Sequence, residues 1–314
     1  MKQRPRLFLL VPLLTLALVA GVLMQPLSTH AATHAAFQGT PHFFWAKGRA
    51  PNSGSGGNLL YHGGPVVVNK MTAYAIFWEP DHTFVGSTYN SLLMRYFRDV
   101  GDSPLYENNE QYTDTSGGAP LDAVLGGSWV DKAPYPSVPF VLDSDIQNEV
   151  THAMNVNGWT PGIHHAFFVF TSLNEFICMS PHLSDCSAPF GGFCAYHSSF
   201  GDANSPTLYG AMPYDGNFLA GCYGLNTSPN RNAAADAEIS TTSHEQIELA
   251  TDPLVNVPNL GSWYDAAGNE IGDKCAYVYG PLKKNGANVS WNGHSYVVQG
   301  EWDNAVSGCV LSGP

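Results

Sequence analysis

The sequence predicts an α+β fold in which helices cover one face of a mixed sheet. Strand-like and helix-like apolar segments follow one another in the order strand, helix, helix, strand, strand, helix, which is typical of a layered α+β domain. The 314 residues include 32 glycines, 22 prolines and six cysteines, so long loops and disulfides are expected as well. The sequence has no internal repeat.

The first strand and the first two helices fall in the first half of the chain. Residues 65–78 are rich in β-branched and aromatic side chains and predict a buried strand. Residues 89–100 carry apolar side chains at helical spacing. A second helix is expected over residues 143–154, with Asp143 or Ser144 as its N-terminal cap.

Two further strands are expected over the apolar runs 165–171 and 208–214. His164 and His165 stand at the start of the first of these runs. Because adjacent strand residues point to opposite faces, we expect one histidine to face the core and the other to face solvent. The pair is therefore not expected to bind one metal ion.

The N-terminus has the pattern of a secretory signal. Lys2, Arg4 and Arg6 precede an apolar run over residues 7–24, and small residues near Ala31 suit a signal peptidase. We therefore predict a signal peptide over residues 1–31 and an extracellular location. No second long apolar run follows, so no membrane anchor is expected after removal of the signal.

The expected mature chain is strongly acidic. Removing residues 1–31 leaves 283 residues (314 minus 31) with 10 basic and 26 acidic side chains, a net charge of −16 (10 minus 26). Binding to a phosphate backbone depends on Lys and Arg, so nucleic acid is not an expected partner. The same charge repels anionic membrane surfaces.

Residues 32–60 resemble a flexible leader or a propeptide-like linker. Residues 51–57, Pro-Asn-Ser-Gly-Ser-Gly-Gly, have a flexible linker composition and follow an aromatic cluster at 43–45. The single domain is therefore expected to span residues 61–314. If the leader is processed, we expect cleavage between Lys47 and Tyr61.

The even number of cysteines in an exported chain predicts disulfides. We expect Cys275 to pair with Cys309 and the other four cysteines to tie a long loop over residues 174–224. His197 lies in that loop and could reach a cleft, although its spacing indicates no partner. A cysteine–zinc site is the alternative, but the sequence contains no C-x-x-C pair.

Residues 236–252 predict a helix of about four turns that ends before Pro253. It contains the pattern H-E-x-x-E, which resembles the zinc-binding H-E-x-x-H with glutamate in place of the second histidine. His244 and Glu248 share one helix face and are candidate metal ligands, and Glu245 is the candidate general base. The alternative is a solvated helix face with a chance histidine.

A second acidic motif follows about twenty residues later. Metallopeptidases of the thermolysin type have a third ligand glutamate at a similar distance, followed by an aspartate that orients a ligand histidine. By this resemblance Glu270 is the third metal ligand and Asp273 holds the tautomer of His244. A zincin-like fold is the corresponding expectation. The alternative is an acidic turn built on the preceding Ala-Gly-Asn.

Several short motifs resemble the Exordium-like, or phosphate-induced, secreted family. They are Gly63-Gly-Pro-Val-Val, Ser243-His-Glu-Gln-Ile-Glu248, Pro253-Leu-Val-Asn, Trp263-Tyr and Glu270-Ile-Gly-Asp-Lys-Cys275, in the family's order. The resemblance extends from about residue 62 to the C-terminus. It implies an extracellular, growth-related protein and no settled enzymatic activity.

Two functions are compatible with these patterns. The first is a secreted metal-dependent hydrolase, a candidate metallopeptidase acting on peptides or proteins with zinc or another divalent metal. The second is a non-catalytic extracellular protein that binds a wall polymer, a glycan or a protein partner and retains a structural or relic metal site. A glycosidase is a third reading, but no second acid at the required separation is indicated.

Overall fold

A computed structural model describes residues 36–50, 56–136 and 140–313. The expected signal peptide, residues 1–31, lies outside these ranges. Among the described residues, no helix is both long enough and apolar enough to cross a membrane. The described part of residues 34–314 forms one compact unit.

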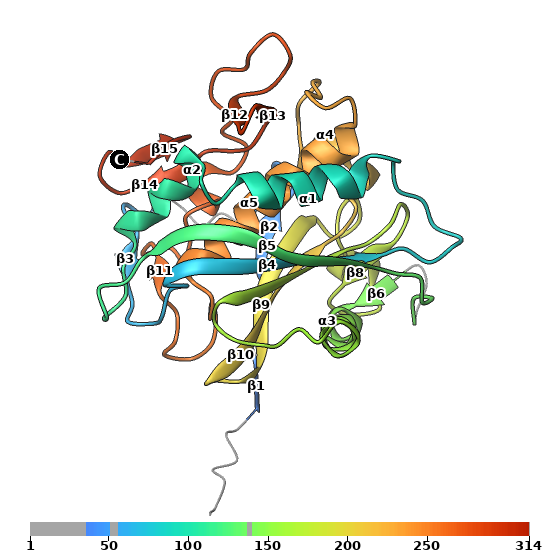
Figure 1. Cartoon of the computed structure of the whole chain (residues 1–314), viewed down its shortest axis with the longest axis horizontal. Helices are drawn as coiled ribbons and strands as arrows, with labels where there is room; N and C mark the ends of the chain where they lie inside the picture. Colours follow the sequence, from blue (N-terminus) through green and yellow to red (C-terminus); the bar gives the residue numbers. More distant parts are fainter. Residues whose placement is uncertain (1–35, 51–55, 137–139, 314) are drawn as a thin grey trace, which may run out of the picture. The chain divides into compact units, whose positions relative to one another are not determined.

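The helices and strands of this unit are labelled in Figure 1 where there is room. The α-helices are α1 (Tyr89–Asp99), α2 (Pro104–Glu107), α3 (Asp143–Asn157), α4 (Leu219–Cys222) and α5 (Ala233–Thr251). Short 3₁₀ helices are η1 (Asn108–Gln111), η2 (Leu183–Asp185), η3 (Asp215–Asn217) and η4 (Asp273–Cys275). The strands are β1 (Ala36–Gln38), β2 (His42–Trp45), β3 (Leu60–Tyr61), β4 (Asn69–Trp78), β5 (Pro120–Asp131), β6 (Phe140–Leu142), β7 (His165–Phe170), β8 (Phe176–Cys178), β9 (Phe193–Asp202), β10 (Ser205–Met212), β11 (Trp263–Tyr264), β12 (Val289–Trp291), β13 (His294–Tyr296), β14 (Glu301–Asp303) and β15 (Gly308–Val310).

The main sheet is mixed, as the sequence predicts. Its order is β1-β9-β10-β7-β4-β5, and β2 also pairs with β9. Strands β10, β7, β4 and β5 are parallel neighbours, whereas β9 is antiparallel to β10, β1 and β2. Parallel strands buried on both faces form continuous apolar runs, and β7 is such a run.

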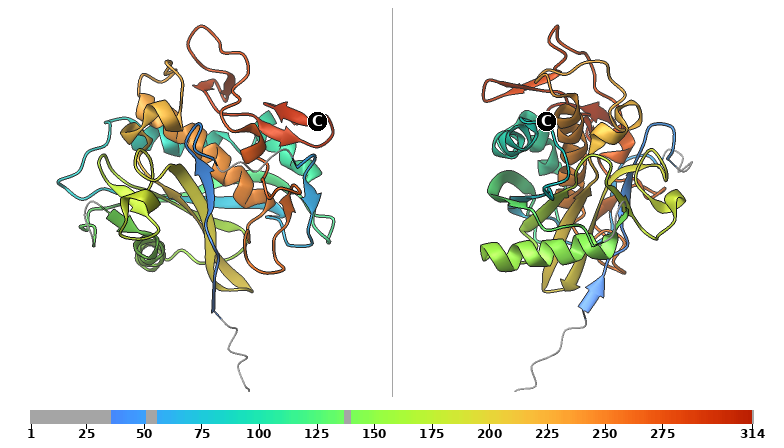
Figure 2. Two further views of the ribbon diagram at one scale, coloured as in Figure 1. Left: turned by 180° about the vertical axis from the view of Figure 1, so that it is seen from behind. Right: turned by 90° about the vertical axis from the view of Figure 1, so that its right-hand side faces the viewer.

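Helices cover both faces of this sheet, which differs from the expectation of one covered face. Helices α1 and α5 pack with one set of β4 side chains, and α3 packs with the alternate set on the opposite face. Figure 2 shows α3 across the sheet from α1. The α+β class is therefore confirmed, while the sheet has a helix on a second face that the sequence did not predict.

The predicted helices and strands are present, with one difference at a cap. Helices α1, α3 and α5 and strands β4, β7 and β10 fall on the predicted segments. The cap of α3 is Leu142 rather than Asp143 or Ser144. The carboxylate of Asp145 accepts a hydrogen bond of 2.9 Å from the Leu142 amide, so the helix begins one residue earlier than a side-chain cap at 143 would allow.

Helix α5 is buried on all sides, although its sequence shows only a narrow apolar stripe. Every residue from Ala234 to Thr251 is buried. Some of its polar atoms hydrogen-bond inside the protein; Gln246 Oε1, for example, accepts a hydrogen bond of 3.0 Å from the Tyr96 hydroxyl. The solvated-face alternative for this helix is therefore wrong.

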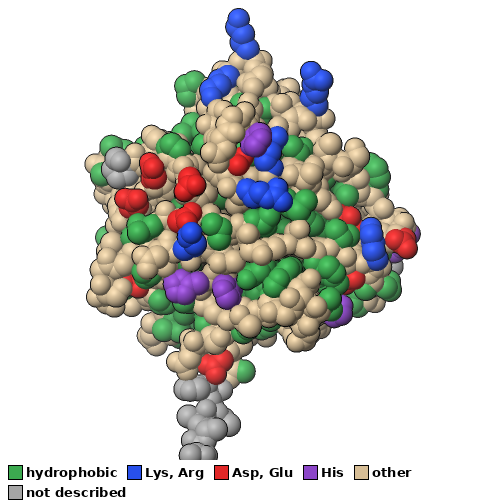
Figure 3. Space-filling view, in the orientation of Figure 1, with side chains coloured by type: hydrophobic (Ala, Val, Ile, Leu, Met, Phe, Trp, Pro, Cys, Tyr) green, Lys and Arg blue, Asp and Glu red, His purple; other side chains and the backbone are tan. Residues whose placement is uncertain are grey.

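Charged side chains are sparse on the face drawn in Figure 3 and are separated by broad uncharged areas. Charged residues make up 12% of the sequence. Some of the acids are removed from the surface altogether, because α5 alone buries Asp236, Glu238, Glu245 and Glu248.

The compact unit extends further toward the N-terminus than the expected start near Tyr61. Strands β1 and β2, which we expected in a leader, pair with β9 in the main sheet. The aromatic cluster at 43–45 supplies the reason: Phe44 is 3% exposed and belongs to the core between the sheet and α5.

The disulfides follow the predicted pattern. Cys275 is bonded to Cys309, and the pairs Cys178–Cys186 and Cys194–Cys222 both lie within the segment 174–224. All six cysteines are therefore paired and none is free to bind zinc.

Candidate metal centre

Helix α5 carries three of the residues that the sequence singles out. His244, Glu245 and Glu248 are all completely buried. The i, i+4 spacing places His244 and Glu248 one turn apart on one face, with 3.1 Å between His244 Nε2 and Glu248 Oε2. Glu245 is directed toward a neighbouring strand.

That neighbour is His197 on β9, which the sequence placed in a loop. His197 is completely buried, and its Nδ1 lies 2.8 Å from Glu245 Oε2 in a hydrogen bond. On the other side of the ring, Nε2 lies 3.4 Å from Glu270 Oε2. His197 thus connects the helix to the second acidic motif, and Glu245 fixes its ring orientation.

A further histidine comes from β2. His42 is the cross-strand partner of His197 in the β2–β9 register. Its Nε2 lies 2.7 Å from Asp273 Oδ2 and 3.3 Å from Glu270 Oε2. No motif in the sequence indicates His42, because it lies in the segment expected to be a leader.

Glu270, in the loop after β11, and Asp273, the first residue of η4, lie next to the helix, as expected. The Asp273 amide donates a hydrogen bond of 3.0 Å to Glu248 Oε1, and the Glu270 amide donates one of 3.1 Å to Asp273 Oδ2. The closest ionic partner of Asp273 is His42. Asp273 Oδ1 lies 3.9 Å from His244 Nε2, a distance too long for a hydrogen bond.

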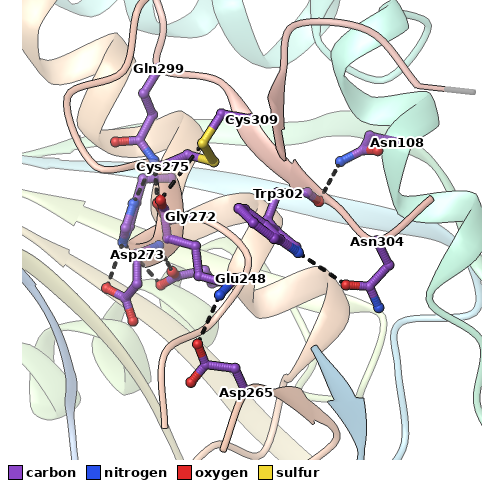
Figure 4. Close-up of a disulfide and its surroundings, with 12 residues drawn as sticks. Asn108, Glu248, Asp265, Gly272, Asp273, Cys275, Gln299, Trp302, Asn304 and Cys309 are labelled. Atoms are coloured by element: carbon purple, nitrogen blue, oxygen red, sulfur yellow. Dashed lines mark hydrogen bonds and ion pairs between the residues drawn. A yellow bond between two sulfur atoms is a disulfide. The ribbon is translucent and has the colours of Figure 1, made fainter. Parts of the chain in front are cut away.

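The ring of His244 is instead held by Gln299, a residue without any motif in the sequence. Gln299 Nε2 lies 2.9 Å from His244 Nδ1 and also donates to the Gly272 carbonyl at 2.9 Å. Figure 4 shows Gln299, Gly272, Glu248 and Asp273 beside the Cys275–Cys309 disulfide. Gln299 therefore orients the ring in place of Asp273, but its amide N–H makes Nδ1 the acceptor and leaves the proton of a neutral imidazole on Nε2, so a metal ligand at Nε2 requires the Gln299 amide to be turned over.

Many polar atoms of this cluster are buried close together without a hydrogen-bond partner. They include His197 Nε2, His244 Nε2, Glu245 Oε1, Glu248 Oε2 and both carboxylate oxygens of Glu270. Unpaired buried polar atoms are costly, so their convergence needs an explanation. Nitrogen and oxygen donors that approach without hydrogen bonding to each other fit a shared divalent cation.

The possible ligand groups overlap at one residue. The described residues include three groups of histidine and carboxylate side chains in which the ligand atoms of each group all lie within 4.8 Å of one another. Each of these groups contains Glu248. One adds His244 and Glu245, another adds His197 and Glu270, and the third joins His42 and Asp273. No group in the described part of the chain contains His244 and Glu270 together, so the expected three-ligand set is not assembled as one unit.

The electrostatics of the cluster are those of carboxylates crowded away from water. Burial lowers the pKa of His42, but Glu270 and Asp273 outweigh it and raise the pKa to about 10. Burial also lowers the pKa of His244, and Glu248 and Glu245 raise it to about 10. Burial raises the pKa of Glu270 well above its usual range. Positive charge is therefore strongly favoured at this position.

Two cavities approach the cluster from outside. One of about 580 Å³ is lined by aromatic residues of the β2 segment, by Tyr277 and by Asp273. The other, of about 310 Å³, is lined by Tyr264, Glu270 and the loop 255–261. His42 and Gly268 line both cavities. Glu245 lines neither.

The fold and the site together define a disulfide-containing α+β protein with a buried histidine–carboxylate cluster. The chain is 25% identical, over 320 aligned positions, to Protein EXORDIUM-like 3 of Arabidopsis thaliana, covering 87% of this chain and 88% of that protein. This similarity supports the Exordium-like family that the motifs indicate. No protein-family model and no solved structure matches the chain.

Proposed function

We propose that this chain is an exported, metal-dependent hydrolase of the peptidase type. Export is supported by the three disulfides and by the similarity to an Exordium-like protein. The observation that best supports a bound metal is the convergence of buried, unpartnered nitrogen and oxygen atoms on the face of α5. We also propose that the H-E-x-x-E helix acts like the metal-binding helix of the zincins.

In the proposal, Glu248 holds a zinc ion or another divalent metal together with Glu270 and His197, whose ligand atoms lie within 4.8 Å of one another. His244, 3.1 Å from Glu248, is the further ligand, and the bound metal would have to draw it toward Glu270. A bound zinc ion supplies Lewis acidity that polarises a peptide carbonyl and lowers the pKa of water. Glu245 has two tasks, because its Oε2 accepts a hydrogen bond from His197 while its Oε1 has no partner. That free oxygen is the acceptor for a proton from water.

The substrate is proposed to be a peptide or protein. Asp273 lies in the wall of the larger cavity, and the aromatic side chains that line this cavity suit an apolar side chain of a substrate. The smaller cavity ends at Glu270 on the other side of His42. A chain passing the cluster would have room on both sides.

A second candidate function is a non-catalytic extracellular binding protein with a structural metal site. The complete burial of Glu245, and its absence from both cavity walls, favour this reading. In that case the metal ties α5, β9 and the 270–273 loop together, and the partner is a wall polymer, a glycan or a protein.

Cleavage of a quenched peptide library by the purified mature protein, with and without a chelator, separates the two. Chelator-sensitive cleavage that zinc restores supports the hydrolase. Metal that is bound at a fixed ratio without any cleavage, together with retention on immobilised glycans, supports the binding protein. A glycosidase would show glycan cleavage in the same samples.

A further inference from the structure

The N-terminal segment 36–46 lies along the outer edge of β9, next to the cluster. Strands β1 and β2 follow one another along this edge, both antiparallel to β9. The amides of Gly39 and Ala46 add hydrogen bonds of 2.7 Å to the carbonyls of Ser199 and Gly192. The segment thus supplies the hydrogen bonds that a separate extended peptide supplies when it adds to a sheet edge.

Two side chains of this segment enter the cluster region. His42 pairs with Asp273 and Glu270, and 84% of its side chain is covered. Phe44 packs on His244, with ring centroids 4.2 Å apart. The same segment forms much of the wall of the larger cavity, and its His42 also lines the smaller one.

We propose that residues 36–46 occupy the place of an extended peptide along β9, so that the chain closes its own site. This inference rests on the proposed hydrolase and names the shape of its substrate, an extended peptide paired with β9. His42 fills the position next to Glu270 that a substrate would need. Departure of the segment removes one wall of the larger cavity and withdraws His42 from Asp273 and Glu270.

The segment has features that allow it to leave. Strand β2 has only four residues and lies at a sheet edge, where pairing involves one neighbour. The residues that follow it, 47–50, are exposed and include Lys47 and Arg49. A protease with basic specificity therefore has access directly after the segment.

The test uses the full mature chain, nicked after Lys47 or Arg49 by brief trypsin treatment. The control is the Lys47→Gln/Arg49→Gln double variant treated in the same way, which corrects for cleavage elsewhere. We expect release of the N-terminal fragment and a gain of at least about tenfold in chelator-sensitive peptide cleavage, because a site that is closed most of the time loses apparent activity in proportion. If the intact protein cleaves peptides, release of the fragment without a gain in that cleavage overturns the proposal, and so does a fragment that cannot be separated from the nicked protein.

A binding measurement keeps this inference distinct from the hydrolase itself. A fluorescent peptide with the sequence of residues 36–46 should bind the nicked protein, and the same peptide with His42→Ala should bind at least about tenfold more weakly, a difference of about 1.4 kcal/mol. Equal affinity of the two peptides, or equal binding to nicked and intact protein, contradicts closure by His42. Peptide binding without any catalytic activity would leave closure standing and reject the hydrolase.

Discussion

Replacing Gly272 by alanine tests how tightly the cluster is built. Gly272 has ordinary helical backbone angles, φ −77° and ψ −41°, so alanine brings no backbone strain. A Cβ at this position would lie 2.6 Å from His244 Nδ1 and 2.9 Å from Glu248 Oε1. Since ordinary contacts begin at 3.4 Å, the imidazole must move by roughly 0.8 Å (3.4 minus 2.6).

This displacement is large compared with the tolerance of metal coordination, about 0.2 Å in ligand distance. We therefore expect Gly272→Ala to lose bound metal and to lower the free energy of unfolding by about 1–3 kcal/mol, as overpacking does. Gly308→Ala is the matched control, because the nearest atom to its Cβ would be Val306 O at 3.8 Å. The control should keep its metal and its stability or gain slightly.

Urea unfolding and elemental analysis of both variants beside the wild type supply the two quantities. Metal retained in Gly272→Ala at the wild-type ratio would refute the placement of His244 and Glu248 as ligands. An equal loss of stability in both variants would show that the effect belongs to glycine replacement in general.

Three further predictions concern single interactions. Glu245→Gln should keep its metal and its fold, since the amide oxygen can still accept a hydrogen bond from His197 Nδ1, but its peptide cleavage should fall by at least about a hundredfold. Glu248→Gln should lose metal and thermal stability together. Equal behaviour of the two variants would contradict their assigned roles. Removing the Cys275–Cys309 disulfide, which spans a sequence separation of 34, should lower the free energy of unfolding by about 4 kcal/mol. A loss of far less than 1 kcal/mol in urea unfolding would disprove this. Burial would raise the pKa of Asp265, but hydrogen bonds from neighbouring amide and ammonium groups lower it to about 2. Asp265→Asn should therefore lower the free energy of unfolding by about 2 kcal/mol above pH 4 and by progressively less as the pH falls toward 2. A loss of stability that does not depend on pH would contradict this.

The elements that the sequence predicts correctly are those whose pattern is local. Helix α1 shows helical spacing and β7 is a continuous apolar run, so both could be read directly. Strand β5 was missed because it contains Gly126 and Gly127, which normally weaken a strand. In the structure a Cβ on either glycine would press against an aromatic ring, of Tyr74 and Trp159 respectively, so tertiary packing explains both glycines.

The candidate site was predictable only where its residues are close in the sequence. The i, i+4 spacing indicates that His244 and Glu248 meet, and the acidic motif points to Glu270. His197 was not predictable as a partner, because β9 is buried on both faces and has no alternating pattern. Gln299 lies 55 residues from His244 and is recognisable only by its contact in the fold.

The most direct test of a metal centre on α5 is the metal content of the purified mature protein. After dialysis against metal-free buffer, we expect a fixed ratio of zinc or another divalent metal per chain in the wild type. His244→Ala should lose it, while His164→Ala, an exposed histidine away from the cluster, should not. A wild-type protein without stoichiometric metal, or a His244→Ala variant that keeps the wild-type ratio, would contradict the account.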